Sequence, residues 1–230
     1  VDKVLVGGTE SGTTSMTIGA FAQIKALSKQ NDEPQKACKP FDKNRDGFVM
    51  AEGSTVLILE SESSAKDRDA KVYGYISGYG SSTDAYHITA PSEGGIGALR
   101  AMEQAISNAD ISKENIDYIN AHGTSTPAND LNETLAIKSL MNDYAYEVNI
   151  SSTKSMTGHL LGGGGAFEAM ASLLSMKNNQ IPPTINLNDS DKDCDLNYTA
   201  NQSVDKNIDH VMSNSFGFGG HNAVLIFSKE

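Results

Sequence analysis

Two histidines and one lysine stand in polar loops that each follow a short apolar segment of this sequence. His122 lies in AHGTSTP after IDYIN, and Lys154 and His159 lie in STKSMTGHLL after VNIS. A third loop of the same design, SNSFGFGGHN, follows HVM near the end of the chain. Functional groups of open α/β sheets gather at the carboxyl ends of strands. The placement of these proton-carrying side chains therefore fits an active site.

Each of these residues also has a structural interpretation when it is taken alone. A single histidine after a strand is often a hydrogen-bonded structural residue, and a single lysine is usually solvated. The four glycines at 162–165 can simply allow close helix packing. The coincidence of two histidines, one lysine and glycine-containing turns in strand-end loops favours an active site.

A metal site is the natural rival for two histidines. His122 and His159 have no third Cys or His at ligand spacing, and Glu133 or Glu168 could complete a zinc set only by chance. Neither phosphate-binding pattern is present, because the chain has no G-x-x-x-x-G-K-[ST] and no G-x-G-x-x-G that opens a helix after a strand. We expect no metal ion and no cofactor.

The segment DKNRDGFVMAEG nearly matches an EF-hand calcium loop. Asp42, Asn44, Asp46 and Gly47 fall on the first six positions of the pattern, but the last position holds Gly53 instead of a bidentate Glu. The following STVLILE is β-branched and aliphatic, which predicts a buried strand where an EF-hand needs a helix. Added calcium should therefore leave the melting temperature unchanged.

Composition narrows the function classes. A chain of 230 residues with 38% hydrophobic residues can bury a sizeable core. No apolar run approaches the roughly 20 residues of a membrane-spanning helix. The net charge of −11 argues against nucleic-acid binding through a general basic surface, although a local basic patch for an acidic partner remains compatible. Two cysteines, Cys38 and Cys194, form no disulfide framework and suit a reducing compartment.

The remaining sequence alternates strand and helix patterns, which predicts an α/β protein. Helical spacing of apolar residues covers Ser15–Ser28, Gly97–Asn108, Asp130–Leu140 and Gly165–Met176. Strands are expected at Val4–Val6, Lys71–Gly80, Ile116–Asn120, Val148–Ser152, Val211–Asn214 and Ala223–Ser228, with a hairpin-like segment at Phe41–Glu60. The chain opens directly on a strand pattern without an initiator Met, so we expect it to start inside a fold.

Five motifs in order resemble those of the β-ketoacyl-[acyl-carrier-protein] synthases, nearest to the type II condensing enzymes of fatty acid synthesis. They are FDKNRDGFVMAEGSTVLILE, AHGTSTPAND, SSTKSMTGHLLG, PPTINL and SNSFGFGGHN. The resemblance implies a thiolase-like layered α/β/α/β/α fold that is incomplete here. Residues 1–40 would end its N-terminal half and residues 41–230 would form its C-terminal half, and DKNRDGF would be a structural turn into the first strand of the second half.

The resemblance also implies a site. His122 and His159 would donate N–H groups to the enolate that forms when a malonyl thioester loses CO2. Lys154 would set the local field with Glu168 as its buried partner, and Glu133 is the second candidate. A purely structural role, in which the Lys154–Glu168 pair only stabilises the fold, is an equal alternative to a direct catalytic role.

The remaining assignments concern the substrates. The Phe218 N–H would complete an oxyanion hole for acyl transfer while its ring gates the acyl pocket. Gly217 and Gly219 in the same turn would also bind substrate. Thr124 and Thr126 would bind the pantetheine arm, with Thr89 as a weaker candidate. Phe21 would line the acyl channel, although ordinary core packing is an alternative for it.

The family's nucleophilic cysteine lies in the first half of the fold, and neither Cys38 nor Cys194 stands in its motif. We therefore expect an acyltransferase that is inactive as this chain alone. Its partner would be acyl carrier protein, the whole protein would form a homodimer, and it would work in the cytoplasm or, after loss of a transit peptide, in a plastid-type organelle. The alternative is a non-catalytic partner subunit of the same fold or an inactive fragment.

Overall fold

The computed structural model describes residues 1–229 and is built around a five-stranded sheet of order β3-β9-β8-β4-β5. The strands are β3 (Tyr75–Thr83), β4 (Tyr118–Asn120), β5 (Asn149–Ser151), β8 (His210–Gly217) and β9 (His221–Ser228). Strand β4 runs parallel to both β5 and β8, whereas β9 runs antiparallel to β3 and β8. The carboxyl ends of three adjacent strands therefore open at one edge of the sheet.

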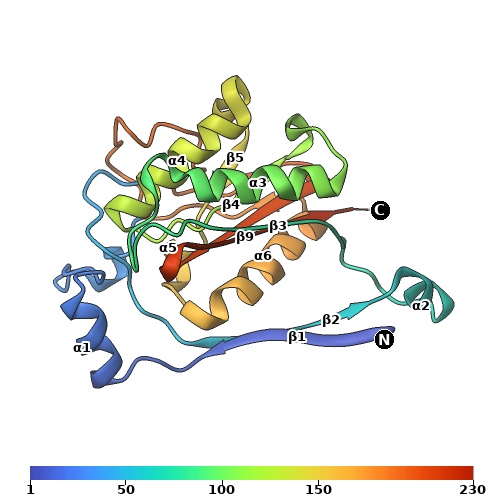
Figure 1. Ribbon diagram of the computed structural model, residues 1–230, viewed down its shortest axis with the longest axis horizontal. Helices are drawn as coiled ribbons and strands as arrows, with labels where there is room; N and C mark the ends of the chain where they lie inside the picture. Colours follow the sequence, from blue (N-terminus) through green and yellow to red (C-terminus); the bar gives the residue numbers. More distant parts are fainter. Residues whose placement is uncertain (230) are drawn as a thin grey trace.

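Helices cover both faces of this sheet (Figure 1). Helices α3 (Ile96–Ala109) and α4 (Pro127–Met141) lie on one face, and α6 (Gly164–Asn178) lies on the other. Small residues bring α3 close to the sheet, since a Cβ added at Gly80 of β3 would lie 1.9 Å from the Ala101 carbonyl oxygen. The larger apolar core fills the α3 and α4 side, and a smaller one that includes Tyr118 and Phe227 packs on α6.

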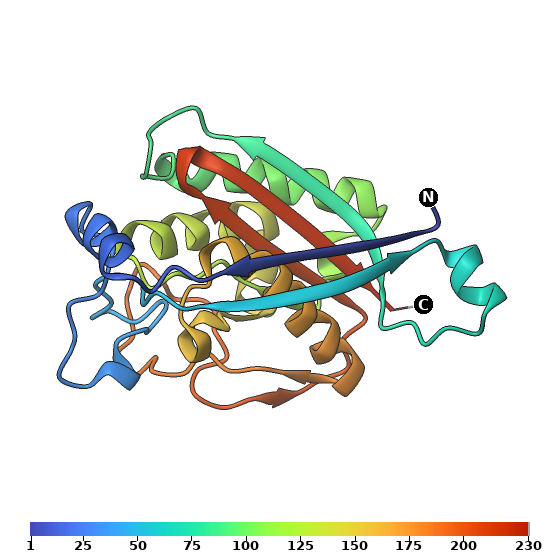
Figure 2. The same cartoon turned by 90° about the horizontal axis from the view of Figure 1, so that it is seen from below.

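A second, two-stranded sheet lies beyond α6, so the chain forms four successive layers (Figures 1 and 2). Its antiparallel strands are β1 (Lys3–Glu10) and β2 (Gly53–Glu60). The shorter elements within residues 1–229 are α1 (Ser15–Gln23), α2 (Glu62–Asp67), α5 (Lys154–Thr157), β6 (Gln180–Ile181), β7 (Val204–Asp205) and six 3-10 turns. None of the helices in residues 1–229 is long and apolar enough to cross a membrane.

The α/β class is confirmed, but two local predictions are wrong. Residues 41–60 do not form a hairpin, because β2 pairs with β1 and the preceding residues make only isolated bridges such as Met50 with His159. Strand β2 is also not buried on both faces, since Val56 and Ile58 are 63% and 66% exposed. It follows that the turn at DKNRDGF leads into a strand that pairs outside the five-stranded sheet.

Helix α1 is shorter than its pattern predicted. The apolar spacing continues to Ser28, but the helix ends at Gln23 and Lys25 takes a positive φ of 56°. Leu27 then forms a parallel bridge with Phe48. The residues after Gln23 therefore pair with the segment before β2 instead of extending the helix.

Candidate active site

The parallel arrangement of β8, β4 and β5 brings the three predicted loops together. His122 follows β4, Lys154 and His159 follow β5, and Phe218 follows β8, all at the same edge of the sheet. The strand order places the three strand-end loops next to one another. The loops are held by a set of buried polar contacts.

The His122 loop is fixed by the carboxylate of Glu133 on α4. The backbone N–H groups of His122 and Gly123 each donate to one Glu133 oxygen at 2.8 Å, and the Asn214 side chain donates to the same carboxylate at 3.1 Å. Burial raises the pKa of Glu133, and these donors oppose the shift. Glu133 thus supports the loop backbone, and it is not the ion-pair partner of Lys154.

Lys154 is almost fully buried and pairs with Glu168 of α6. Its Nζ also lies 3.4 Å from Nδ1 of His122. Burial raises the pKa of the Glu168 carboxyl, and the adjacent ammonium opposes that shift. The charge on Lys154 is therefore compensated on one side and directed at the His122 ring on the other.

His159 completes the cluster. The rings of His122 and His159 lie edge to face, with centroids 5.3 Å apart and planes at 82°. Nδ1 of His159 accepts the Leu161 N–H at 3.1 Å, and Nδ1 of His122 faces the Lys154 ammonium, which can only donate. Both contacts assign the ring proton to Nε2 in each histidine.

Both imidazoles are held neutral. Burial lowers the pKa of His159 to about 3, and the Lys154 charge adds to the effect. The pKa of His122 is lowered well below its ordinary value, first by burial and then by Lys154 and His159. The site therefore presents two neutral N–H donors over a wide pH range.

Phe218 follows β8 at the same edge of the sheet as this cluster. It begins a short turn after Gly217 and is 47% exposed, with its ring centroid 6.3 Å from that of Phe21 on α1. Gly219 takes a φ of +82° that favours glycine, and its N–H donates to the Ile88 carbonyl at 2.6 Å. The turn is thus held to a neighbouring loop while the Phe218 side chain reaches solvent.

The three threonines take different positions. Thr124 is buried, and its hydroxyl lies 2.8 Å from that of Thr126, which caps α4 by accepting the Asn129 N–H. Thr89 lies in the loop after β3, where its N–H donates to Nδ1 of His87. The Thr126 hydroxyl thus has a structural role as the N-cap of α4. Binding of substrate by the three threonines stays a prediction.

Both cysteines are poor nucleophiles. Cys38 is buried, its thiol donates to the Lys154 carbonyl oxygen, and burial raises its pKa to about 12. Burial likewise raises the pKa of Cys194 to about 11. Neither thiol is activated as a thiolate. Residues 1–229 therefore contain the two histidine N–H donors and the Lys154–Glu168 ion pair but no cysteine nucleophile.

The calcium-like segment uses its side chains within the chain. The Asp42 carboxylate accepts the Asn44 N–H at 2.8 Å, Asp46 accepts the Ser28 hydroxyl at 2.6 Å, and Gly53 begins β2. Within residues 1–229, no group of three or more His, Cys, Asp or Glu side chains is arranged to hold a metal ion.

Two supporting residues lie in the quoted motifs but received no role. Phe48 packs its ring edge against His159, with centroids 5.3 Å apart, and Asn214 bonds Glu133. In the sequence, Phe48 follows Asp46-Gly47 and Asn214 ends a predicted strand, so ordinary turn and strand structure explains both residues. Only the tertiary contacts reveal that both support the histidine cluster.

Asp84 was also missed. Its carboxylate accepts a hydrogen bond from the Asn222 side chain at 2.7 Å, and its N–H donates to the Gly220 carbonyl at 2.8 Å. These contacts tie the loop after β3 to the Phe218 turn. The residues are far apart in the sequence, so spacing offered no signal for the pair.

Comparisons with known proteins agree with this geometry. The sequence model described as the β-ketoacyl synthase C-terminal domain matches residues 73–188, and the β-ketoacyl synthase N-terminal domain matches residues 1–65. The chain belongs to the β-ketoacyl synthase family. The boundary at residue 40 was not tested by these matches and stays a prediction.

The curated relatives are longer proteins. The chain is 53% identical over 226 residues to 3-oxoacyl-[acyl-carrier-protein] synthase 2 of Synechocystis, covering 98% of this chain and 54% of the relative. It is 50% identical over 228 residues to the Staphylococcus aureus protein of the same name, covering 99% and 55%. The chain thus spans about half the length of the curated relatives it matches.

Solved structures confirm the thiolase-like ketosynthase fold of this part. A ketosynthase bound to a hexaketide and in complex with its type II acyl-carrier protein has a TM-score of 0.98 at 39% identity, over all of this chain and 57% of that one. A β-ketoacyl synthase from Burkholderia phymatum has a TM-score of 0.94 at 38% identity, over all of this chain and 55% of that one.

Proposed function

We propose that this chain supplies the decarboxylation part of a 3-oxoacyl-[acyl-carrier-protein] synthase active site. The observation that carries the proposal is the pair of neutral imidazoles whose Nδ1 atoms are both engaged, so that both present Nε2–H. A malonyl thioester that loses its carboxylate as CO2 places negative charge on its thioester oxygen. His122 and His159 stabilise that enolate by donating hydrogen bonds without transferring a proton.

The full reaction is a decarboxylative Claisen condensation. The enolate carbon attacks an acyl thioester, a carbon–carbon bond forms, and the enzyme's thiolate leaves to give the 3-oxoacyl thioester. In the step before, an enzyme thiolate attacks the acyl thioester of the carrier, forms the acyl-enzyme thioester and releases the carrier's thiolate. Because Cys38 and Cys194 are buried thiols with raised pKa values, neither of them supplies that thiolate. The isolated chain is therefore expected to be inactive as an acyltransferase, as its sequence predicts, and to retain only the decarboxylation of a malonyl thioester.

The other site residues assist this step. Lys154 positions His122 through its Nδ1 contact, and Glu168 compensates the buried charge. The Phe218 N–H joins the N–H of the absent cysteine as the oxyanion hole for acyl transfer. Gly217 and Gly219 allow the substrate to approach the turn closely.

The substrate arm and the partners follow from the same reaction. Thr124, Thr126 and Thr89 line the pantetheine path, and Phe21 lines the acyl channel next to Phe218. The partner is acyl carrier protein carrying malonyl or acyl groups, and the whole protein forms a homodimer. The unpaired cysteines fit a reducing cytoplasm, with a plastid-type organelle as the alternative.

The test is the conversion of malonyl-acyl carrier protein to its acetyl form, followed by intact mass. We expect His122→Ala and His159→Ala each to lower the decarboxylation rate by about 10²–10³, as for the loss of one oxyanion donor. His210→Ala is the matched control, because His210 lies at the opposite end of β8, with Nδ1 2.7 Å from the Ser228 hydroxyl.

Wild-type protein that decarboxylates no faster than the buffer would contradict the proposal. So would equal rates for wild type and both histidine variants, which is the result expected of a non-catalytic partner subunit. Circular dichroism of each variant separates loss of chemistry from loss of fold.

A further inference from the structure

The turn that follows His159 has a strained backbone. It spans Leu161–Gly163 and leads into α6. Leu161 takes a φ of 46°, which falls in the left-handed region that a leucine seldom adopts. Its N–H is the group that donates to Nδ1 of His159 at 3.1 Å. A residue other than glycine keeps such a conformation only where its surroundings enforce it, so the position of the His159 ring proton depends on what holds this turn.

The end of β1 lies against the turn. The Glu10 carboxylate accepts the Gly162 N–H at 3.2 Å with one oxygen and the Ser11 N–H at 3.2 Å with the other. A Cβ added at Gly8 would lie 2.5 Å from the Gly162 carbonyl oxygen, so a glycine is needed for the β1 backbone to come this close. Gly162, the neighbour of Leu161, is therefore restrained at its N–H by Glu10 and at its carbonyl by the β1 backbone.

The segment before β2 holds the backbone of His159. The Ala51 N–H donates to the His159 carbonyl at 3.0 Å, and the His159 N–H donates to the Val49 carbonyl at 2.7 Å. A Cβ added at Gly163 would lie 3.1 Å from the Gly53 carbonyl oxygen, so the turn also packs against the start of β2. These contacts fix the main chain of His159, whereas the proton on its ring is set by the turn.

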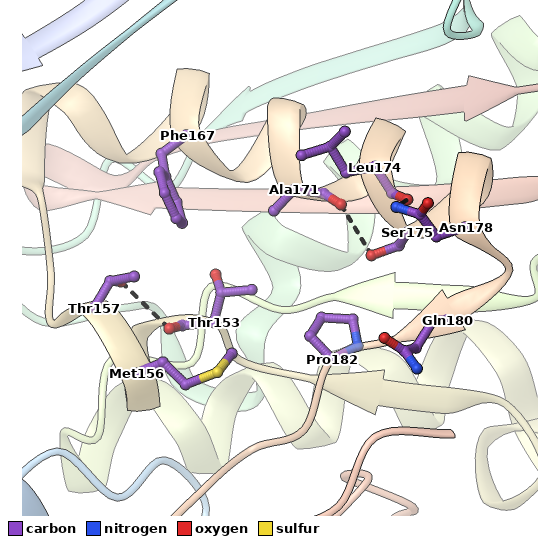
Figure 3. Close-up of a pocket in the computed structure, with 10 residues that line it drawn as sticks. All are labelled: Thr153, Met156, Thr157, Phe167, Ala171, Leu174, Ser175, Asn178, Gln180 and Pro182. Carbon is purple, nitrogen blue, oxygen red and sulfur yellow. Dashed lines mark hydrogen bonds between the residues drawn. The ribbon is translucent and has the colours of Figure 1, made fainter. Parts of the chain in front are cut away.

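Another side of α6 faces α5 and Pro182, as Figure 3 shows. The hydrogen bonds drawn there run from the Thr157 hydroxyl to the Thr153 carbonyl and from the Ser175 hydroxyl to the Ala171 carbonyl. The first joins α5 to its own N-cap residue and the second stays within α6. These bonds do not involve residues 161–163, so the restraint on the turn that is described above comes from β1 and β2.

We propose that Glu10 is a positioning residue for decarboxylation. By holding Gly162, it keeps Leu161 in the left-handed conformation, and the Leu161 N–H then keeps the His159 proton on Nε2. The carboxylate also lies at the start of α6, where backbone N–H groups without helical partners favour a negative charge. Glu10 acts through the backbone of the turn and not on the substrate. This inference rests on the proposed role of His159 and extends the site to a strand of the other sheet.

The experiment measures the ring tautomer of His159 by nitrogen NMR and the decarboxylation rate in the same variants. Wild-type His159 should be protonated on Nε2 alone. Glu10→Ala should allow the tautomer protonated on Nδ1 to appear and should lower the rate by roughly three- to tenfold, as expected for the loss of one hydrogen bond to a charged group. Glu10→Gln keeps a carbonyl oxygen that can accept the Gly162 N–H, so it should stay within about twofold of wild type.

Glu52→Ala is the matched control. Glu52 is another glutamate whose carboxylate accepts a backbone N–H, that of Thr13 at 2.8 Å, but Thr13 lies outside the turn. Its loss should leave the His159 tautomer unchanged and alter the rate by less than about twofold. A purely structural role of Glu10 would lower the melting temperature of Glu10→Ala without changing the tautomer, and that result would overturn the proposal.

Leu161→Gly provides a second test, because glycine adopts a positive φ without strain. In that background Glu10→Ala should change the rate by less than about twofold, since the turn no longer needs to be held. If Glu10→Ala does not fold, Glu10→Asp, whose carboxylate is one methylene shorter, replaces it in the same comparison. The proposal is wrong if the Glu10 variants keep the wild-type tautomer or if Glu10→Gln behaves like Glu10→Ala. An altered tautomer in a protein whose wild type does not decarboxylate would support this role of Glu10 and overturn the proposed function alone.

Discussion

At the residue scale, the site depends on two imidazoles that stay neutral. Burial and the Lys154 charge lower the pKa of His159 to about 3, against an ordinary value near 6.5. The unfolded chain therefore takes up a proton as pH falls below about 6.5, whereas the folded chain does so only near 3. The contribution of His159 to the free energy of unfolding is complete above about 6.5 and decreases as pH falls through this window.

We predict that the His159 ring shows no titration between pH 8 and 5. The Cε1–Hε1 NMR signal, assigned by its loss in His159→Ala, should keep the chemical shifts of a neutral ring tautomer protonated on Nε2. The same signal in the urea-unfolded protein serves as control and should titrate near 6.5. A midpoint above about 5 in the folded protein would contradict the burial and charge that define this site.

The residue types of the site were readable from the sequence, and the family resemblance named Glu168 as the partner of Lys154, which the ion pair in the structure matches. The contacts of Glu133 were not readable. His122, Lys154 and His159 were marked by their place after strands. Glu168 pairs with Lys154, whereas Glu133 accepts hydrogen bonds from backbone N–H groups. Which glutamate takes which role depends on how α4 and α6 face the loops. No local pattern encodes such contacts between distant helices.

At the scale of elements, close contact between α3 and β3 holds the sheet under its helical layer. A Cβ added at Gly80 would lie 1.9 Å from the Ala101 carbonyl oxygen and 2.7 Å from the Ala105 nitrogen, both of which are backbone atoms that cannot easily move. We predict that Gly80→Ala lowers the free energy of unfolding by about 1–3 kcal/mol, as overpacking does. Urea unfolding measures the change.

Gly19→Ala is the matched substitution. Gly19 lies within α1, and a Cβ added there meets nothing within 4 Å. Alanine is favoured over glycine in a helix by up to about 1 kcal/mol, so this variant should be as stable as wild type or more so. Equal destabilisation by both variants would show that the α3–β3 contact is looser than the structure describes.

Long elements were predicted well because their patterns repeat. Helix α3 was expected at Gly97–Asn108 and spans Ile96–Ala109, and α6 was expected at Gly165–Met176 and spans Gly164–Asn178. The hairpin at residues 41–60 failed because strand pairing is non-local, and β2 finds its partner in β1 about fifty positions earlier. Aliphatic strand residues indicate a strand but do not reveal which neighbour covers them.

At the scale of the whole molecule, the β1–β2 sheet has an apolar face that none of residues 1–229 covers. Leu5 and Ile58 are paired across the two strands and are 72% and 66% exposed, and Val56 beside them is 63% exposed. The opposite face of this sheet packs on α6, with Leu57 in the smaller core. Within residues 1–229, this face of the sheet is therefore an apolar surface in contact with water.

We predict that this face causes the chain to self-associate. The double variant Leu5→Thr and Ile58→Thr places a β-branched residue at both strand positions and removes the apolar contact. Light scattering at equal concentration should therefore fall, while the free energy of unfolding changes by less than about 1 kcal/mol. Ile88→Thr is the control, because Ile88 is 79% exposed but lies outside this sheet. A monodisperse wild type, or an equal effect of the control, would contradict the prediction. Association that depends on Leu5 and Ile58 alone would locate the contact on the outer face of β1 and β2, on the far side of α6 from the five-stranded sheet and its histidine cluster.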